Sequence, residues 1–348
     1  MEELPAELVG EIARRLPLKS RAALRAVSSS VKSKVDEQKG KAWSSASAAE
    51  KQAALHRACA KGSLESAKWL HSTFGLTAED ARANDNWALR LACENGHLPE
   101  AQWLHSTFGL TVEDARANDN WALQVACGNG HLPEAQWLVE TFGLTAKDAR
   151  VYDNMALRLA CENGHLPVAQ WLHSTFGLTA KDARACGNWA LRGACQRGHL
   201  PEAQWLHSTF GLTVEDARAN DNWALRGACQ HGHLPEAQWL VETFGLTAED
   251  ARAYNNYALR GACVNGHLIV AQWLHRTFEL TVQDARAHDN YALRLACENG
   301  HLPEAQWLAS KFRLTAEDAR ADNNYALRYA RENGHLEVVK WLQGTYGE

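Results

Sequence analysis

Apolar and polar positions repeat along most of this chain with a period of 34 residues. The copy WALRLACENGHLPEAQWLHSTFGLTVEDARANDN, at residues 87–120, shows the pattern clearly. Its first part carries one narrow apolar face at helical spacing, formed by Ala88, Leu89, Ala92 and Cys93. The side chains on this face are mostly small, so a neighbouring helix can approach closely. The pattern therefore predicts a short first helix in each copy.

A second helix is predicted from Pro99 to about Phe108, since proline suits the first turn of a helix, where its missing N–H costs little. We expect it to end at Gly109, which can adopt the left-handed conformation of a Schellman motif. Thr111-Val112-Glu113-Asp114 then resembles a capping box. It predicts a third, short helix from Thr111 to about Ala117, before an Asn118-Asp119-Asn120 turn.

Nine copies of this pattern, here called repeats one to nine, fill residues 53–348. They begin at Ala53, Trp87, Trp121, Met155, Trp189, Trp223, Tyr257, Tyr291 and Tyr325. Repeat nine is shorter than the others, as expected of a C-terminal cap. Because stacked repeats share one continuous core, the period predicts an all-α solenoid of nine 34-residue repeats.

The order Ala-Leu-x-x-Ala-Cys-x-x-Gly-His-Leu, followed by a second helix that contains Trp-Leu, is similar to the ankyrin repeat. The Gly-His turn recurs from Gly96-His97 to Gly334-His335. The resemblance implies that the concave face of the array binds other proteins. The chain departs from the family in its period, which is about 33 residues in ankyrin repeats, and in the third helix, which replaces a β-hairpin. Tetratricopeptide repeats share the 34-residue period but lack the Gly-His turn, and they rank second.

Residues 1–37 lie outside the period and predict a separate helical module. Leu8, Ile12 and Leu16 fall at i, i+4 and i+8, and Pro17 ends that helix before two further short ones. Three short helices bury little surface alone, so the module needs a partner or a neighbour. Residues 38–52 are rich in Ser, Ala and Lys and are expected to form a linker.

The segment LPAELVGEIARRLPLKSRAALRAVSSSVKSKV resembles an F-box. The resemblance implies docking on the Skp1 adaptor of a cullin ubiquitin ligase through Leu4, Pro5, Leu8, Ile12, Leu16, Pro17, Leu24 and Val27. The alternative is a helical N-terminal cap for the repeats. An F-box followed by these divergent repeats is also similar to proteins of giant DNA viruses of amoebae, which implies a host-cell setting.

Composition and charge mainly exclude function classes. Hydrophobic residues make up 46% and charged residues 22%, as in an ordinary folded protein. A net charge of −5 disfavours a nucleic-acid partner. No segment is apolar over the length of a membrane span, and Met1-Glu2-Glu3 is acidic where a signal peptide is basic. We therefore expect a cytoplasmic or nuclear protein with no membrane partner.

Eight of the nine cysteines recur every 34 residues, and only Cys186 falls outside the series. Equivalent positions of stacked helices lie roughly 8–10 Å apart, beyond the ~7 Å between Cα atoms that a disulfide bridges, so we expect reduced thiols in the core. Most repeats place a histidine four residues after this cysteine, but a metal or catalytic centre is a single constellation. No nucleotide-binding, metalloprotease or nucleophile motif occurs. We expect no enzyme activity, metal or cofactor.

Two aromatic columns follow the period. One lies in the second helix, and we expect a buried ladder there in preference to a platform for stacking nucleic-acid bases: Trp69, Trp103, Trp137, Trp171, Trp205, Trp239, Trp273, Trp307 and Trp341. The other column begins the first helices, where core and groove positions are equally compatible with the sequence. The Asp-Ala-Arg motifs, such as Asp114 with Arg116, are expected to provide helix capping and surface charge.

Repeats five to seven differ from the others in the first helix. In four other repeats the first-helix arginine has an acid four residues on, as Arg90 has Glu94. In repeats five to seven that acid is absent and a glycine follows the arginine, at a cost of about 1 kcal/mol relative to alanine. The glycines either open a basic hollow or admit a neighbouring helix while Asp221 pairs with an arginine. The hollow would be a target-binding groove for an acidic or phosphorylated segment, formed by Arg192, Gly193, Gln196, Arg197, Arg226, Gly227, Gln230, His231, Arg260 and Gly261.

The sequence thus favours a non-enzymatic adaptor for protein interactions. As the substrate receptor of a ubiquitin ligase, it would hold a Skp1-like adaptor with its N-terminal module and an unidentified target protein with its repeats. Its mechanism would be proximity, because it raises the effective concentration of the target near the ligase. The alternative is a scaffold or sequestering protein of the ankyrin type with no link to a ligase.

Overall fold

The computed structural model describes residues 47–347. The chain divides into two compact bodies, residues 1–152 and residues 153–348. We call them the N-terminal and C-terminal bodies and describe each separately. All regular elements of the described residues are helices, which confirms the all-α fold.

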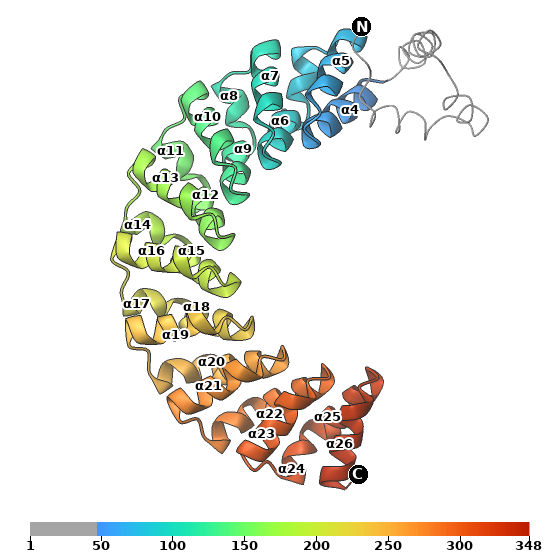
Figure 1. The fold of residues 1–348 in the computed structure, drawn as a ribbon, viewed down its shortest axis with the longest axis vertical. Coiled ribbons are helices and arrows are strands. Elements are labelled where there is room, and N and C mark those ends of the chain that lie inside the picture. Colours follow the sequence, from blue (N-terminus) through green and yellow to red (C-terminus); the bar gives the residue numbers. More distant parts are fainter. Residues whose placement is uncertain (1–46, 348) are drawn as a thin grey trace, which may run out of the picture. The chain divides into compact units, whose positions relative to one another are not determined.

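The N-terminal body contains the first repeats (Figure 1). Its helices are α4 (Ala48–Ala60), α5 (Leu64–Phe74), α6 (Ala78–Glu94), α7 (Leu98–Phe108), α8 (Val112–Ala115), α9 (Ala117–Gly128), α10 (Leu132–Phe142) and α11 (Ala146–Ala149), and α12 (Val151–Glu162) begins at its end.

The C-terminal body continues the same pattern. Its helices are α13 (Leu166–Phe176), α14 (Ala180–Ala183), α15 (Ala185–Arg197), α16 (Leu200–Phe210), α17 (Val214–Ala217), α18 (Ala219–Gln230), α19 (Leu234–Phe244), α20 (Ala248–Val264), α21 (Leu268–Phe278), α22 (Val282–Glu298), α23 (Leu302–Lys311), α24 (Ala316–Ala319), α25 (Ala321–Glu332) and α26 (Leu336–Tyr346). The first helices α15, α18, α20 and α22 follow one another, each packed on the next and on the second helix of its own repeat (Figure 1).

The third helix is confirmed. In repeat two it is α8, and the main-chain N–H of its N-cap Thr111 donates to the Asp114 carboxylate at 2.7 Å, as a capping box requires. The tip that follows consists of Asn118, Asp119 and Asn120, all in the left-handed region with φ of 52°, 57° and 62°. Asn and Asp tolerate this conformation better than other non-glycine residues. A capped helix and a left-handed tip therefore stand where ankyrin repeats have a β-hairpin.

The end of the second helix is also confirmed. Gly109 has φ of 62°, and its N–H donates to the main-chain oxygen of His105 at 2.9 Å. The following Leu110 is buried, as the apolar contact of a Schellman motif requires. In repeats seven and eight, Glu279 and Arg313 adopt the left-handed conformation at this position.

The core lies between the two long helices of each repeat and the helices of the next repeat. Alanine, leucine and cysteine at the predicted apolar positions fill it, as Ala88, Leu89 and Cys93 do in repeat two. The eight periodic cysteines are all buried as free thiols. Burial raises the pKa of each of these thiols, which makes them unreactive.

The expectation of a buried tryptophan ladder in the second helix is wrong. All nine tryptophans are half-buried, whereas the leucine that follows each one, such as Leu206 after Trp205, is buried. Adjacent residues of an α-helix point about 100° apart, so only one of each Trp-Leu pair can enter the core. The half-buried Trp205 instead packs edge-on against the buried Phe210, with ring centroids 5.4 Å apart.

Candidate functional site

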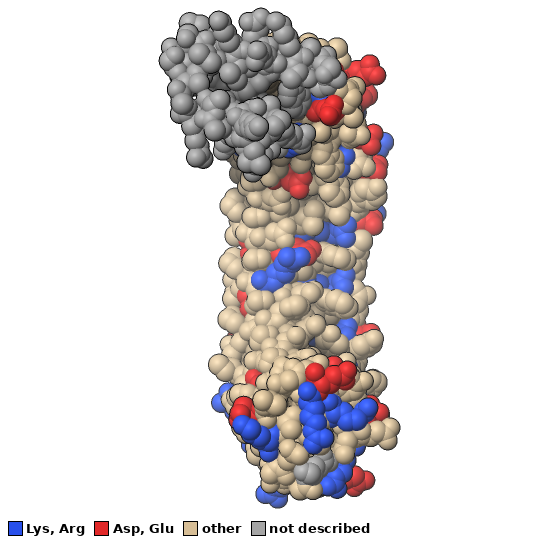
Figure 2. Space-filling view, turned by 90° about the vertical axis from the view of Figure 1, so that its right-hand side faces the viewer, with Lys and Arg blue, Asp and Glu red and all other residues tan. Residues whose placement is uncertain are grey.

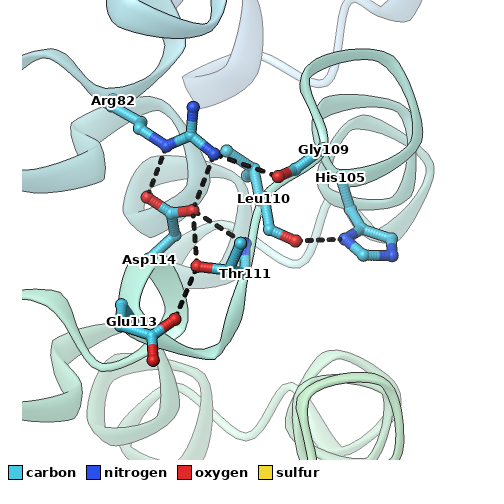
Figure 3. A network of polar contacts seen from close by, with 7 residues as sticks. All are labelled: Arg82, His105, Gly109, Leu110, Thr111, Glu113 and Asp114. Atoms are coloured by element: carbon cyan, nitrogen blue, oxygen red, sulfur yellow. Dashed lines mark hydrogen bonds and ion pairs between the residues drawn. The ribbon is translucent and has the colours of Figure 1, made fainter.

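Neighbouring repeats are joined by a recurring ion pair. In the N-terminal body, Arg82 Nε lies 2.8 Å from Asp114 Oδ1, and its Nη2 donates to Asp114 Oδ2 and to the main-chain oxygen of Gly109 (Figure 3). Asp114 therefore caps its own short helix and receives an arginine from the preceding repeat. The sequence predicted that Asp114 caps its helix but did not predict its ion pair with Arg82. The same pair recurs as Arg116–Asp148, Arg184–Asp216, Arg218–Asp250, Arg252–Asp284 and Arg286–Asp318.

These aspartates stay ionised to unusually low pH. Burial alone would raise the pKa of Asp148, but hydrogen bonds from Arg116 and Thr145 outweigh burial and bring it down to about 2. The pKa values of the other five aspartates are lowered by the same competition: Asp114, Asp216, Asp250, Asp284 and Asp318.

A second set of contacts runs along the first helices of the C-terminal body. Guanidinium groups alternate there with aromatic rings from successive repeats, at 4.9–5.8 Å from guanidinium carbon to ring centroid. These distances are within the range of cation–π attraction. We call this set the arginine–aromatic stack: Trp189, Arg192, Trp223, Arg226, Tyr257, Arg260, Tyr291, Arg294 and Tyr325. The aromatic residues that begin the first helices therefore lie at the surface, where Trp189 and Trp223 are each 41% exposed.

The three arginines of repeats five to seven are held by their own helices. Arg192 Nη2 donates to the main-chain oxygen of Cys186 at 2.8 Å, and Arg226 and Arg260 make the same contact with the residue six positions back in their helices. The Nε atoms of all three are buried without a hydrogen-bond partner. Burial lowers the pKa of each, but from so high an ordinary value that the groups remain charged at neutral pH.

None of these three arginines forms an ion pair with a carboxylate of the described residues. Asp221 attracts Arg226 without pairing with it. Their charges are therefore compensated less than that of Arg294, which pairs with Asp322. The partner of Arg294 is not the acid four residues on, because Glu298 instead accepts a hydrogen bond from Tyr325, so the compensation expected within the first helix is not seen as an ion pair in repeat eight.

The three glycines are explained by packing. Gly193, Gly227 and Gly261 are buried, and a Cβ added at Gly193 would lie 3.0 Å from Glu162 Cβ of the preceding repeat. At Gly227 and Gly261 the added atom would meet Gln196 and Gln230 at 3.1 Å. The sequence left two explanations of these glycines open, a basic hollow or the close approach of a neighbouring helix. The structure supports the second, because the glycines admit a neighbouring helix and do not open a hollow.

Polar side chains at the end of several first helices accept a hydrogen bond from the aromatic residue that begins the next repeat. Trp189 Nε1 donates to Glu162 at 2.8 Å, and Trp223 Nε1 donates to Gln196 at 3.1 Å. Arg197 pairs with Glu162 at 2.7 Å. The structure thus brings the predicted groove residues together on α15, α18 and α20. Arg197 and His231 are exposed there, while Gln196 and Gln230 bridge neighbouring repeats.

Cys186 differs from the other eight cysteines because it lies at the exposed tip of repeat four, just before repeat five begins. We expect a thiol reagent such as DTNB to label one cysteine of the native protein and all nine after denaturation, since only an accessible thiolate reacts. Absorbance of the released chromophore gives the number. A Cys186→Ser variant should then show no native labelling, and labelling of two or more native thiols would contradict the burial of the periodic cysteines.

Helical repeats that stack on one another through side-chain contacts define an α-solenoid. Comparisons with family models show to which family this solenoid belongs. A model of ankyrin repeats (3 copies) matches residues 89–183 and 259–347, which together make up more than half of the chain. The chain therefore belongs to the ankyrin-repeat proteins. A model of the F-box domain matches residues 1–43.

Both matched domains are non-catalytic modules that bind other proteins, and a chain that combines them is a protein-interaction adaptor. The predicted Skp1-binding residues, Leu4 to Val27, lie outside the described residues. No curated protein matches the chain. Among the described residues, no helix is long and apolar enough to cross a membrane, and no cluster of His, Cys, Asp and Glu could hold a metal ion.

Proposed function

We propose that the chain is the substrate receptor of a Skp1–cullin–F-box ubiquitin ligase. The observation that carries the proposal is the F-box match over residues 1–43, directly followed by the repeats, whose first described helix begins at Ala48. In this proposal residues 1–37 form the F-box module, residues 38–52 connect it to the repeats, and residues 53–348 hold the target. The last five residues of that connection already belong to α4.

The proposed mechanism is proximity. A target held by the repeats and a ligase core held by the F-box module become parts of one complex, so ubiquitin transfer proceeds at a high effective concentration. The chain itself supplies no reacting group in this scheme. The target surface that we propose lies on repeats five to seven, where Arg197 and His231 are exposed beside the arginine–aromatic stack.

Leu8→Asp and Leu16→Asp are each expected to abolish Skp1 binding while leaving the repeats folded, because a charge would enter an apolar contact on a separate module. A pull-down of the full chain with purified Skp1 measures binding, and circular dichroism measures the helical content. The resemblance to giant-virus proteins makes amoebal Skp1 the appropriate adaptor.

Leu336→Asp serves as the matched control, because Leu336 is a largely exposed leucine of repeat nine and its replacement should leave Skp1 binding unchanged. Unaltered Skp1 binding by both module variants, with helical content retained, would overturn the F-box assignment. A chain that still captures its target but never recruits Skp1 would be a scaffold.

A further inference from the structure

The arginine–aromatic stack of repeats five to seven points to the chemistry of a partner. We propose that this surface binds a carboxylate-rich protein segment that also carries apolar side chains, and that the three stacked arginines attract it through their charge and not by direct hydrogen bonds. The proposal rests on the proposed function in so far as the segment belongs to the target.

The first argument is charge. In the segment from the tip that precedes a repeat through the end of its first helix, repeat five carries Arg192 and Arg197, repeat six carries Asp221 and Arg226, and repeat seven carries Arg260, a net charge of +3, of which Arg197 is paired with Glu162. The same segment has a net charge of −1 in each of repeats two, three, four and eight. The whole chain has a net charge of −5, so positive charge is concentrated at this place. On the face seen in Figure 2, basic and acidic side chains lie beside one another in a few places, and wide areas of non-ionic residues separate these places.

The second argument is the orientation of the aromatic rings. The Trp223 ring has two guanidinium groups over it, that of Arg192 at 5.5 Å and that of Arg226 at 5.4 Å, and the Tyr257 ring has those of Arg226 and Arg260 at 5.2 and 5.4 Å. Since nucleic-acid bases stack on ring faces, flanking guanidinium groups disfavour them. Trp189 and Trp223 are each 41% exposed and their indole N–H groups already donate to Glu162 and Gln196, while ring edges carry the positive end of the quadrupole. Such a surface suits apolar groups and anions together.

The third argument is the enclosure of the arginines. Arg226 and Arg260 are only 5% and 6% exposed, and one nitrogen of each already donates to a main-chain oxygen. The fork of N–H groups that binds a phosphate bidentately is therefore not presented to solvent. Partly buried charges are screened less by salt than exposed ones, so these arginines still act on a partner nearby. The geometry thus favours attraction of carboxylates over direct recognition of a phosphate.

Binding of the full chain to a random copolymer of glutamate and tyrosine tests the proposal. The informative variant is R192Q/R226Q/R260Q, because the chain itself places Gln124 in this column in repeat three, where it is buried and donates to the main-chain oxygen of Asp119 at 2.7 Å. We expect the unmodified chain to bind the copolymer, with affinity that falls as salt increases. We expect the glutamine triple to lose about tenfold or more, as removal of three weak charge interactions predicts.

The matched control is R90Q/R158Q/R328Q, which removes three arginines that also lie over aromatic rings and have an acid four residues on, but are not members of the arginine–aromatic stack. It should bind the copolymer within about threefold of the unmodified chain. R192K/R226K/R260K, which keeps the charges, should do the same. Melting curves identify unfolded variants, and single Gln substitutions replace any triple that fails to fold.

Three results would overturn the proposal. Equal loss in both glutamine triples would show that repeats five to seven have no special role. A lysine triple as weak as the glutamine triple would show direct contact by the guanidinium groups. Tighter binding of a thymidine oligonucleotide than of the copolymer would indicate a nucleic-acid surface. None of these measurements involves Skp1, so this proposal and the ligase assignment can fail independently.

Discussion

Replacing Gly198 with alanine is expected to lower the free energy of unfolding by about 3 kcal/mol or more. Gly198 has φ of 79°, and an L-residue pays roughly 1–2 kcal/mol for the left-handed conformation. The added Cβ would also lie 2.6 Å from Nδ1 and 2.7 Å from Cε1 of the His233 ring in the next repeat. Overpacking of this kind costs typically 1–3 kcal/mol. Urea denaturation of the full chain, followed by circular dichroism, measures the change.

Two glycines of the same body separate the two contributions. Gly211 has φ of 59°, and Gly334 occupies the place of Gly198 in repeat nine with φ of 78°, yet nothing lies within 4 Å of a Cβ added at either. Gly211→Ala and Gly334→Ala should therefore lose only the conformational part, about 1–2 kcal/mol. Equal losses in all three variants would show that the His233 ring yields freely and that the contact between repeats contributes nothing.

This Gly-His contact shows what the sequence could and could not predict. The turn itself was predictable, because glycine after a helical pattern is a local signal. That the histidine of one repeat covers the glycine of the preceding repeat was not, because that contact depends on how two repeats stack. The Arg82–Asp114 pair is a similar case. The arginine and the aspartate of each ion pair are always 32 residues apart in the sequence. The aspartate and the arginine within one Asp-Ala-Arg motif, however, are an equally plausible pair when only the sequence is known.

The candidate surface was likewise predictable from the sequence only in part. The sequence identified repeats five to seven from their missing acids and their glycines, and the structure places those residues on successive helices. The sequence could not show that the arginines lie between aromatic rings, since Trp189 and Arg192 are three residues apart while the second ring comes from the next repeat. The same limit explains the tryptophan column, where two adjacent apolar residues compete for one core position.

Acid is expected to destabilise the repeats steeply between about pH 4 and pH 2. The pKa values of six inter-repeat aspartates are lower in the folded chain than the ordinary value of about 3.9 that they regain on unfolding. A carboxylate with a lowered folded pKa stabilises the protein above its unfolded value, and this stabilisation is lost as the pH falls through the folded value. For Asp148, whose folded pKa is about 2, the contribution at neutral pH is about 2 kcal/mol.

Asp148→Asn isolates one of these carboxylates. The amide keeps the shape of the side chain but cannot carry the charge that pairs with Arg116, so the variant should lose about 2 kcal/mol at pH 7. It should also approach the unmodified chain in stability as the pH falls towards 2, because Asp148 is then almost fully protonated in the unfolded state and about half protonated in the folded state, so little stabilisation remains. Glu140→Gln, an exposed acid of α10, should leave the pH dependence unchanged. If Asp148→Asn remained equally destabilised at pH 7 and at pH 2, its effect would come from packing, and the ion pair between repeats would not be the source of acid sensitivity.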